Sequence, residues 1–444
     1  MKITQYTRFD DGSLRAIPLL CRPDTQQQEL QLLNLYPDIC FQQIGVFGGA
    51  ITDAVGAVLE QLPYETAKKL ISGYFGPDGI GYRAIRTHID SCDFSTAPYS
   101  AQGEFSGESL EAFSLAHDKK RIIPWIKLAY ELAGDKLPVM LTPWSPPAYM
   151  KTNQSRTGGG HLKPEYYGLW ASYICLYIKA YIEEGILVDS ISVQNEPNAV
   201  QIWDSCLFSP QEEKSFLLEA LYPCMKKEGL EHIRIYVWDH NKERLYDRAC
   251  QLIDEQTDNM IAGLAFHWYS GDHFEALDLV RHRFPDKLLT FSEGCIEYSR
   301  HDKDHLRNAQ IYAHDMLGNF RCGMNNFYDW NICLDEKGGP NYAGNFCDAP
   351  VMCDVETGLI QQRLSYGYIS QFSSFIKEGA RRIGSSIYTD ALETVAFVNP
   401  DGEIIAIILN RNAEDYKLTL RLDADIADLS VPANSLSTVS IKNI

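Results

Sequence analysis

The sequence predicts an α/β fold: a (β/α)8 TIM barrel with a small antiparallel β side domain. Two observations carry this prediction. Eight strand candidates alternate with helical stretches between residues 44 and 379, and short strands separated by turn residues follow in 380–444. We assign 44–379 to the barrel, 380–444 to a β-sandwich-like side domain and 1–43 to strands that join that side domain. A doubly wound open sheet is the competing fold, but the chain has no glycine-rich phosphate turn to mark its ligand crevice.

The eight strand candidates are short apolar runs of the kind expected for parallel strands that are buried on both faces. They are 44–51, 82–89, 137–142, 189–194, 233–239, 260–269, 287–292 and 324–330.

Helices are predicted between the strands. In 164–185, aromatic and aliphatic residues recur at three- and four-residue spacing, and Gly185 ends the helix. In 209–229, Ser209 and Glu212 form a capping box sequence, with Pro210 at the first helical position. Further helices are expected at 118–133, 304–318 and 365–378.

The pattern in 380–444 is that of an antiparallel sheet. Residues 394–398 and 403–409 flank the turn sequence Asn-Pro-Asp-Gly and predict a β-hairpin, and 418–422 and 436–441 add strands. The partial alternation of 29–35 predicts an N-terminal strand that joins this domain.

Composition excludes several classes of function. The 444-residue chain has a formal net charge of −19, which is unsuited to nucleic acid and to an anionic membrane surface. Its N-terminus lacks the apolar core of a signal peptide, and no stretch of about 18 apolar residues occurs. We therefore expect a cytoplasmic protein without stable membrane insertion.

No metal or cofactor is predicted. The 12 cysteines contain no CxxC pair, and neither HExxH nor a phosphate-loop sequence is present. His301 and His305 are four residues apart, but the charged sequence HDKDH is better explained as a loop or helix start.

Two predicted strands each end in a glutamate. Glu196 follows 189–194 in the sequence Asn-Glu-Pro, and Glu293 follows 287–292. A lone glutamate at such a place is most simply a solvated charge. Two of them on the C-terminal face of one barrel form the carboxyl pair that glycoside hydrolysis requires.

The other strand ends carry residues of the types that bind sugars. Aromatic rings can stack on a pyranose while amide, carboxyl and imidazole groups bind its hydroxyls, so a mixed pocket is expected. For any single tryptophan, packing in the core is an equally good interpretation. For Arg86 and Asp93, spacing alone favours a structural ion pair inside the barrel. The candidates are Arg86, Asp93, Trp144, Asn195, His267, Tyr269 and Trp330.

With these motifs in place, the chain resembles glycoside hydrolase family 30, which includes lysosomal glucosylceramidase. The matching segments are FGGAITDA (47–54), IGYRAIRTHIDSCDFS (80–95), TPWSPPAYMKTN (142–153), SVQNEP (192–197), FHWY (266–269), SEGC (292–295), DWNICLDEKGGPNYAGNF (329–346) and VNPDGEIIAIILNR (398–411).

The resemblance implies a barrel with a β-sandwich-like side domain and retention of anomeric configuration. It implies that Glu196 is the acid/base and Glu293 the nucleophile. It also implies sugar contacts at several positions, with His267 and Tyr269 near the nucleophile: Asp93, Trp144, Asn195, Trp330 and Asn345. Val46 and Gln194 depart from the family pattern, which bears on the aglycone.

The function expected is therefore that of a glucosylceramidase-like retaining β-glycosidase acting on β-glucosides. The alternatives are a β-1,6-glucanase, a β-xylosidase or a β-fucosidase. A non-catalytic glycan-binding barrel is less favoured, because a binding protein has no need of both glutamates. Retention requires the two carboxyls to lie about 5–5.5 Å apart.

Overall fold

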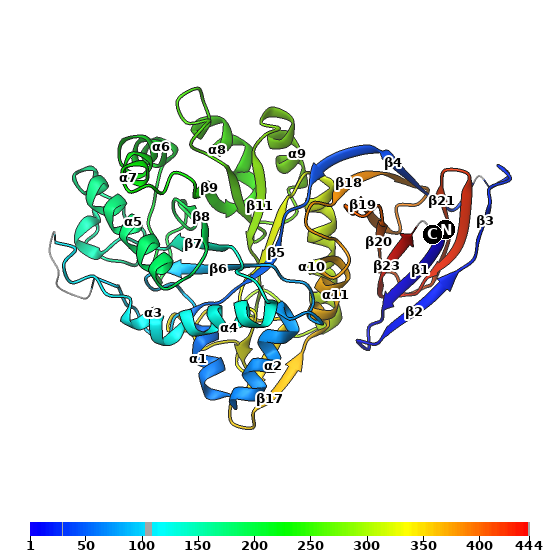
Figure 1. Cartoon of the computed structure of the whole chain (residues 1–444), viewed down its shortest axis with the longest axis horizontal. Coiled ribbons are helices and arrows are strands. Elements are labelled where there is room, and N and C mark those ends of the chain that lie inside the picture. Colours follow the sequence, from blue (N-terminus) through cyan, green and yellow to red (C-terminus); the bar gives the residue numbers. More distant parts are fainter. Residues whose placement is uncertain (29, 103–108, 443–444) are drawn as a thin grey trace. The chain divides into compact units, whose positions relative to one another are not determined.

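The computed structural model describes residues 1–28, 30–102 and 109–442. The chain forms two compact units (Figure 1). One consists of 47–300 and 326–361, and the other of 1–46, 301–325 and 362–444.

The first unit contains a closed barrel of eight parallel strands in the order β10-β11-β13-β5-β6-β7-β8-β9. Each of the eight predicted ranges overlaps one strand, so the barrel prediction is confirmed. The strands are β5 (Phe47–Ala50), β6 (Ala84–Ile89), β7 (Val139–Pro143), β8 (Val188–Ser192), β9 (Arg234–Asn241), β10 (Gly263–His267), β11 (Leu288–Glu293) and β13 (Asn326–Asp329).

Helices connect the strands along the chain. None among the described residues is both long and apolar enough to cross a bilayer. They are α1 (Asp53–Gln61), α2 (Tyr64–Phe75), α3 (Ala116–Arg121), α4 (Ile123–Ala133), α5 (Tyr167–Glu183), α6 (Pro210–Phe216), α7 (Tyr222–Lys227), α8 (Leu245–Leu252), α9 (Phe274–Arg283), α10 (His305–Arg321) and α11 (Leu364–Ser373). The last two, α10 and α11, belong to the second unit.

The helix predicted at 209–229 is present and carries the predicted capping box. Ser209 Oγ accepts from Glu212 N at 3.2 Å, and Ser209 N donates to Glu212 Oε2 at 2.7 Å. A π-helical segment, Leu217–Leu221, joins α6 to α7, and no sequence pattern indicated it.

Four helices were expected from the alternation with strands, but without bounds: α1, α2, α8 and α9. Gly56 and two valines weaken the helix propensity of α1. Seven of its nine residues are nevertheless buried, so tertiary packing stabilises this helix against its local preference.

The second unit contains a ten-stranded sheet in the order β2-β1-β23-β20-β19-β18-β4-β21-β22-β3. The predicted hairpin is β19 with β20, and β4 covers part of the predicted N-terminal strand, whose first residue, 29, lies outside the described part. The pairing of β4 with β21 is parallel. The strands are β1 (Lys2–Arg8), β2 (Leu14–Leu19), β3 (Cys21–Pro23), β4 (Leu32–Gln43), β18 (Arg381–Ile387), β19 (Glu393–Val398), β20 (Ile404–Asn410), β21 (Tyr416–Leu422), β22 (Asp425–Val431) and β23 (Ser435–Lys442).

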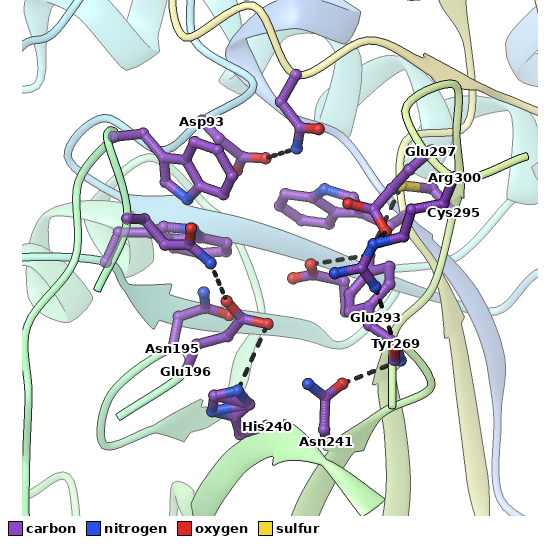
Figure 2. Close-up of a pocket in the computed structure, with 15 residues that line it drawn as sticks. Asp93, Asn195, Glu196, His240, Asn241, Tyr269, Glu293, Cys295, Glu297 and Arg300 are labelled. Atoms are coloured by element: carbon purple, nitrogen blue, oxygen red, sulfur yellow. Dashed lines mark hydrogen bonds and ion pairs between the residues drawn. The ribbon is translucent and has the colours of Figure 1, made fainter. Parts of the chain in front are cut away.

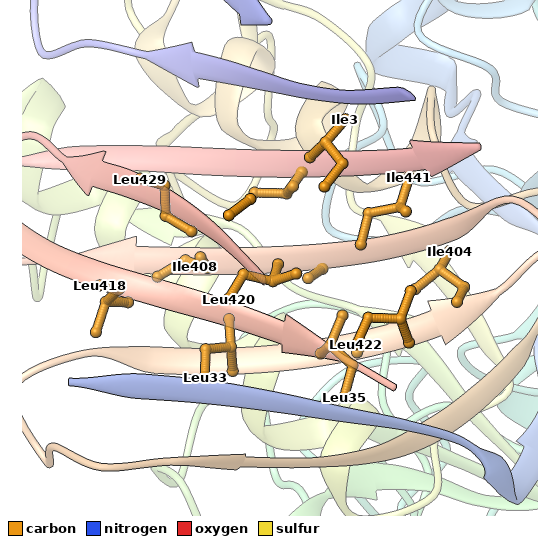
Figure 3. Close-up of a cluster of buried hydrophobic side chains, with 14 of the residues drawn as sticks. Ile3, Leu33, Leu35, Ile404, Ile408, Leu418, Leu420, Leu422, Leu429 and Ile441 are labelled. Atoms are coloured by element: carbon orange, nitrogen blue, oxygen red, sulfur yellow. The ribbon is translucent and has the colours of Figure 1, made fainter. Parts of the chain in front are cut away.

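One apolar core lies inside this sheet. Ile3 of β1, Leu33 of β4, Ile408 of β20 and Leu429 of β22 belong to the same buried cluster (Figure 3). The sheet therefore curls until its distant strands face each other, which accounts for a sandwich built from one sheet.

The first unit also contains a two-stranded and a three-stranded sheet. They are β12 (Ile296–Glu297) with β15 (Cys347–Asp348), and β14 (Leu334–Asp335) with β16 (Val351–Asp354) and β17 (Leu359–Gln362).

We predict that Gly56→Ala destabilises the barrel unit. A Cβ at this position would lie 1.9 Å from the backbone oxygen of Arg121, so α1 and α3 would have to separate. Overpacking of this kind costs roughly 1–3 kcal/mol, which urea denaturation would measure.

The matched control is Gly168→Ala in α5, where a Cβ meets no atom within 4 Å. Alanine there should raise the free energy of unfolding by roughly 0.5–1 kcal/mol. Equal effects of the two substitutions would contradict the close contact between α1 and α3.

Candidate active site

Glu196 and Glu293 face one another from the ends of two barrel strands. Glu293 is the last residue of β11, and Glu196 lies four residues beyond the end of β8. The chain turns at Glu196, whose φ of +45° is in the left-handed region, and its N–H donates to Asp239 O at 2.9 Å. One carboxylate oxygen of Glu196 lies within 4.8 Å of one of Glu293.

Both glutamates line a cavity of about 150 Å³ (Figure 2). Eight of the ten residues named from the sequence line it: Asp93, Trp144, Asn195, Glu196, Tyr269, Glu293, Trp330 and Asn345. They come from the ends of different strands and from the loops that follow them.

Arg86, expected as a sugar contact, instead lies behind the glutamates and is fully buried. Its Nη1 donates to Glu293 Oε2 at 2.7 Å, and its Nη2 donates to Asp239 Oδ2 at 3.0 Å and to Asn195 Oδ1 at 3.1 Å. The ion pair with Asp93 favoured by spacing is therefore wrong, because Asp93 accepts from Asn345 Nδ2 at 3.2 Å.

The carboxylate of Asp239 bonds to both Arg86 and His267, and a β-bulge in β9 brings it into this position. Ala265 of β10 pairs with Trp238 and Phe266 pairs with His240, so Asp239 is the extra residue in β9. Trp238 and Asp239 have φ values of +73° and +46°. The bulge turns the Asp239 carboxylate toward Arg86, and this carboxylate also accepts from the hydroxyls of Ser192 and Ser292, both at 2.5 Å.

His267, also expected as a sugar contact, is completely buried and lies between carboxylates. Its Nδ1 is 3.3 Å from Glu196 Oε1, and its Nε2 is 3.0 Å from Asp239 Oδ1. Nε2 is also 4.0 Å from Glu293 Oε2. His267 therefore contacts Glu196 from behind, as Arg86 contacts Glu293, and neither residue lines the cavity.

Glu196, His267 and Glu293 are close enough to suggest a metal site. The hydrogen bonds of His267 argue against it: each ring nitrogen faces a carboxylate oxygen, so the ring is best satisfied as an imidazolium, which has no lone pair for a metal. Burial alone would lower the pKa of His267, but the charges of Glu293, Asp239 and Glu196 raise it to about 9.

The net pKa shifts of the two glutamates are opposite. Burial raises the pKa of Glu293 above its ordinary value, and the nearby Glu196 adds to this, while His267 and Arg86 oppose it. Burial also raises the pKa of Glu196, but the hydrogen bonds from His267 and Gln201 and the charges of His240 and His267 together outweigh burial and lower the pKa. Since the two carboxyls are close and share His267, they titrate as a unit.

Two aromatic residues of the cavity, Trp144 and Trp330, are stacked and buried. The rings of Trp144 and Trp330 have centroids 5.3 Å apart at 17°, and the Arg86 guanidinium lies about 5 Å from both. Each tryptophan thus combines the two interpretations left open by the sequence: it packs in a buried cluster and also lines the cavity.

Seven lining residues were not predicted from the sequence: Gln201, Trp203, His240, Asn241, Cys295, Glu297 and Arg300. His240 and Asn241 end β9, so the rule used for the other strand ends would have found them. Gln201 donates to Glu196 Oε2 at 3.4 Å, and Glu297 pairs with Arg300 at 3.2 Å. These residues beyond the barrel strands carry no pattern that marks them in advance.

Known proteins share this barrel and its side domain. The glycosyl hydrolase family 30 TIM-barrel domain matches residues 44–376, and the family's beta sandwich domain matches 379–439. The chain belongs to glycoside hydrolase family 30. It is thus a glycoside hydrolase, and the fold predicted from the sequence is that of its family.

Several known proteins are similar to this chain over most of its length. Lysosomal acid glucosylceramidase of Mus musculus is 31% identical over 430 residues, covering 92% of this chain and 82% of the relative. An endo-1,6-beta-D-glucanase of Neurospora crassa is 25% identical, covering 85% and 81%. Among solved structures, SrfJ from Salmonella typhimurium has a TM-score of 0.95 at 36% identity and an endo-β1,6-glucanase one of 0.88 at 26%, each covering both chains completely.

We predict that Asp239→Asn is strongly destabilising. The substitution keeps the shape of the side chain but leaves Arg86 and His267 without their shared anion, and breaking a buried ion pair costs roughly 3–5 kcal/mol. Urea denaturation would measure this loss in the free energy of unfolding. Asp428→Asn is the control, since its pair with Arg22 is exposed and should contribute about 0–1 kcal/mol. A loss at Asp239 no larger than at Asp428 would contradict the network.

We also predict a pH dependence of stability from His267. Its pKa is raised in the folded protein, so its contribution is fully present below about pH 6.5 and is lost as the pH rises through about 9. Between pH 7 and 8 the free energy of unfolding should fall by about 1 kcal/mol more in the native chain than in His267→Gln. Parallel curves for the two proteins would count against a charged His267.

Proposed function

We propose that this family 30 enzyme is a retaining β-glycosidase that hydrolyses β-glucosides, with Glu293 as nucleophile and Glu196 as acid/base. The observation that carries the proposal is the approach of their carboxylate oxygens to within 4.8 Å in one cavity. Retaining enzymes hold their carboxyls about 5–5.5 Å apart, whereas inverting enzymes leave roughly 6.5–9.5 Å for a water molecule.

The chemistry is a double displacement. Glu293 attacks C1 as Glu196 protonates the leaving oxygen, and Glu196 then removes a proton from the water that hydrolyses the ester. Arg86 and the Tyr269 hydroxyl, 2.7 and 3.1 Å from the two Glu293 oxygens, stabilise the attacking carboxylate. Once Glu293 is an ester its charge is gone, which lowers the proton affinity of Glu196 when a base is needed.

Asn195 is suited to bind the sugar 2-hydroxyl. Its Oδ1 accepts from Arg86, which fixes the side-chain orientation, and no group in the described part of the chain accepts from its Nδ2. Asp93 and Asn345 supply polar groups at another part of the cavity wall. The volume of about 150 Å³ is below the 300–1,000 Å³ usual for drug-sized ligands, which favours one sugar unit and exo action.

For the aglycone we propose a glucosylceramide-like amphiphile, because several relatives similar over most of the chain carry the name glucosylceramidase. The second candidate is a β-1,6-linked glucan, supported by the relatives named as endo-1,6-glucanases. A panel of aryl β-glycosides, then glucosylceramide and β-1,6-glucan, distinguishes these substrates. A protein that bound all of them without turnover would be a glycan-binding barrel.

We predict that azide distinguishes the two glutamates. Glu293→Ala should abolish hydrolysis, because no other group can attack C1, and azide should restore turnover of an activated β-glucoside as the α-glucosyl azide. Glu196→Ala should still form the glycosyl-enzyme from a dinitrophenyl β-glucoside, and azide should then give the β-glucosyl azide. The anomer is read by proton NMR.

Glu297→Ala is the control, because it removes a third carboxylate from the same cavity without touching the reacting pair. It should yield neither azide product. The same anomer from both glutamate variants would refute the assignment of their roles.

A further inference from the structure

The loop beyond β8 presents alternate side chains to the cavity. Gln201 and Trp203 line it, whereas Val200 and Ile202 are 63% and 76% exposed. This is the alternation of an extended chain that has one face on the cavity and the other in solvent. Since Gln201 and Trp203 are themselves half-buried, they lie where the cavity opens to solvent.

The backbone of this loop is held from both sides. Gln201 N donates to Ser205 Oγ at 3.2 Å, and Gly158 N donates to Gln201 O at 2.8 Å. The buried carboxylate of Asp204 accepts from Arg156 Nε at 2.9 Å. The loop is therefore ordered before a ligand binds, which reduces the cost of binding. None of these bonds uses the Gln201 side chain, so that side chain can be replaced without loss of the loop.

The Gln201 carboxamide lies on the leaving-group side of the site. Glu196 Oε1 faces His267 at 3.3 Å and His240 at 4.0 Å, which leaves Oε2 to meet the glycosidic oxygen. Gln201 Nε2 donates to this Oε2 at 3.4 Å. A leaving group that bonds to Oε2 therefore passes beside the carboxamide. Gln201 Oε1 accepts from no group in the described part of the chain.

Trp203 extends the aromatic wall of the cavity toward its mouth. It packs against the buried cluster that contains Trp144 and Trp330. The cavity volume of about 150 Å³ favours one sugar unit, so the leaving group must lie outward of that unit, where Gln201 and Trp203 are. A carboxamide both donates and accepts hydrogen bonds, and beside an aromatic ring it suits a ligand that has polar groups on a carbon skeleton.

We propose that Gln201 and Trp203 form the leaving-group subsite and select aglycones that carry a hydroxyl or amide group close to the glycosidic oxygen. The Gln201 carboxamide binds that polar group, and the Trp203 ring packs against the carbon skeleton. The proposal rests on the function proposed above. A sugar unit of a glucan carries hydroxyls at this place, and a ceramide carries an amide and a hydroxyl, so the shared chemistry is a polar group and the test distinguishes the two sources.

The test compares leaving groups that need the acid equally but differ in polar groups. Gentiobiose and cyclohexylmethyl β-glucoside both release a primary alcohol on a six-membered ring, and only the first leaving group carries further hydroxyls. Glucosylceramide and hexadecyl β-glucoside, in the same detergent micelles, are the corresponding pair for an amphiphile. The native chain should have the higher kcat/KM, by about tenfold, for the polar member of one pair, and that pair identifies the leaving group.

Gln201→Met keeps the length of the side chain and removes its polar atoms. It should lower kcat/KM for the polar member about tenfold relative to the apolar member, the factor expected for one hydrogen bond. Any effect of the lost contact with Glu196 falls on both members alike and cancels in the ratio. Trp203→Leu should lower both members about tenfold, because the ring packs on either carbon skeleton. Ile202→Ala, on the exposed face of the same loop, is the control and should change neither member.

An unchanged ratio in Gln201→Met would overturn the proposal and leave Gln201 a residue that only positions Glu196. A native chain without preference in either pair, or full activity of Trp203→Leu on both members, would also overturn the subsite. Failure of the native chain to hydrolyse p-nitrophenyl β-glucoside is a different outcome, because it would reject the glycosidase function itself.

Discussion

The buried carboxylate of Asp239 is the group on which the geometry of the site depends. It accepts from Arg86 and His267, the two cations that reach Glu293 and Glu196 respectively. The two glutamates do not bond to each other. Their separation is set by two cations bound to one anion, so a shift of Asp239 would move both ends of the carboxyl pair.

This arrangement needs an irregular backbone. A regular β9 would point successive side chains to opposite faces, and the bulge at Asp239 interrupts that alternation. A second irregularity between Phe266 and His267 aligns His267 with Glu293 on the neighbouring strand. The left-handed φ values of Trp238, Asp239 and Glu196 all occur here, which agrees with the tendency of strained residues to gather at functional sites.

Much of the fold could be predicted because buried parallel strands and amphipathic helices have distinct periods in the sequence. Glu196 and Glu293 could be located because each follows an apolar strand. His267 was expected near the nucleophile, and its Nε2 lies 4.0 Å from Glu293 Oε2. That Arg86 and His267 lie behind the cavity and do not line it could not be predicted, since the direction of a strand side chain depends on register. The role of Asp239 could not be predicted either. It is the last residue of the strand candidate 233–239, and no local sequence pattern reveals the bulge that turns its side chain toward Arg86.

The curled sheet has a consequence for biosynthesis. β1 pairs with β23, and β4 pairs with β18 and β21, so strands made first are partnered by strands made last. Translation at 5–20 residues per second separates β1 from β23 by roughly 20–90 s. During that time the apolar side chains of Ile3, Leu33 and Leu35 have no partners from the later strands. β1 can pair early only with β2, and β4 has both edges open until β18 and β21 are made, so the nascent chain exposes strand edges that favour aggregation while the barrel is being made.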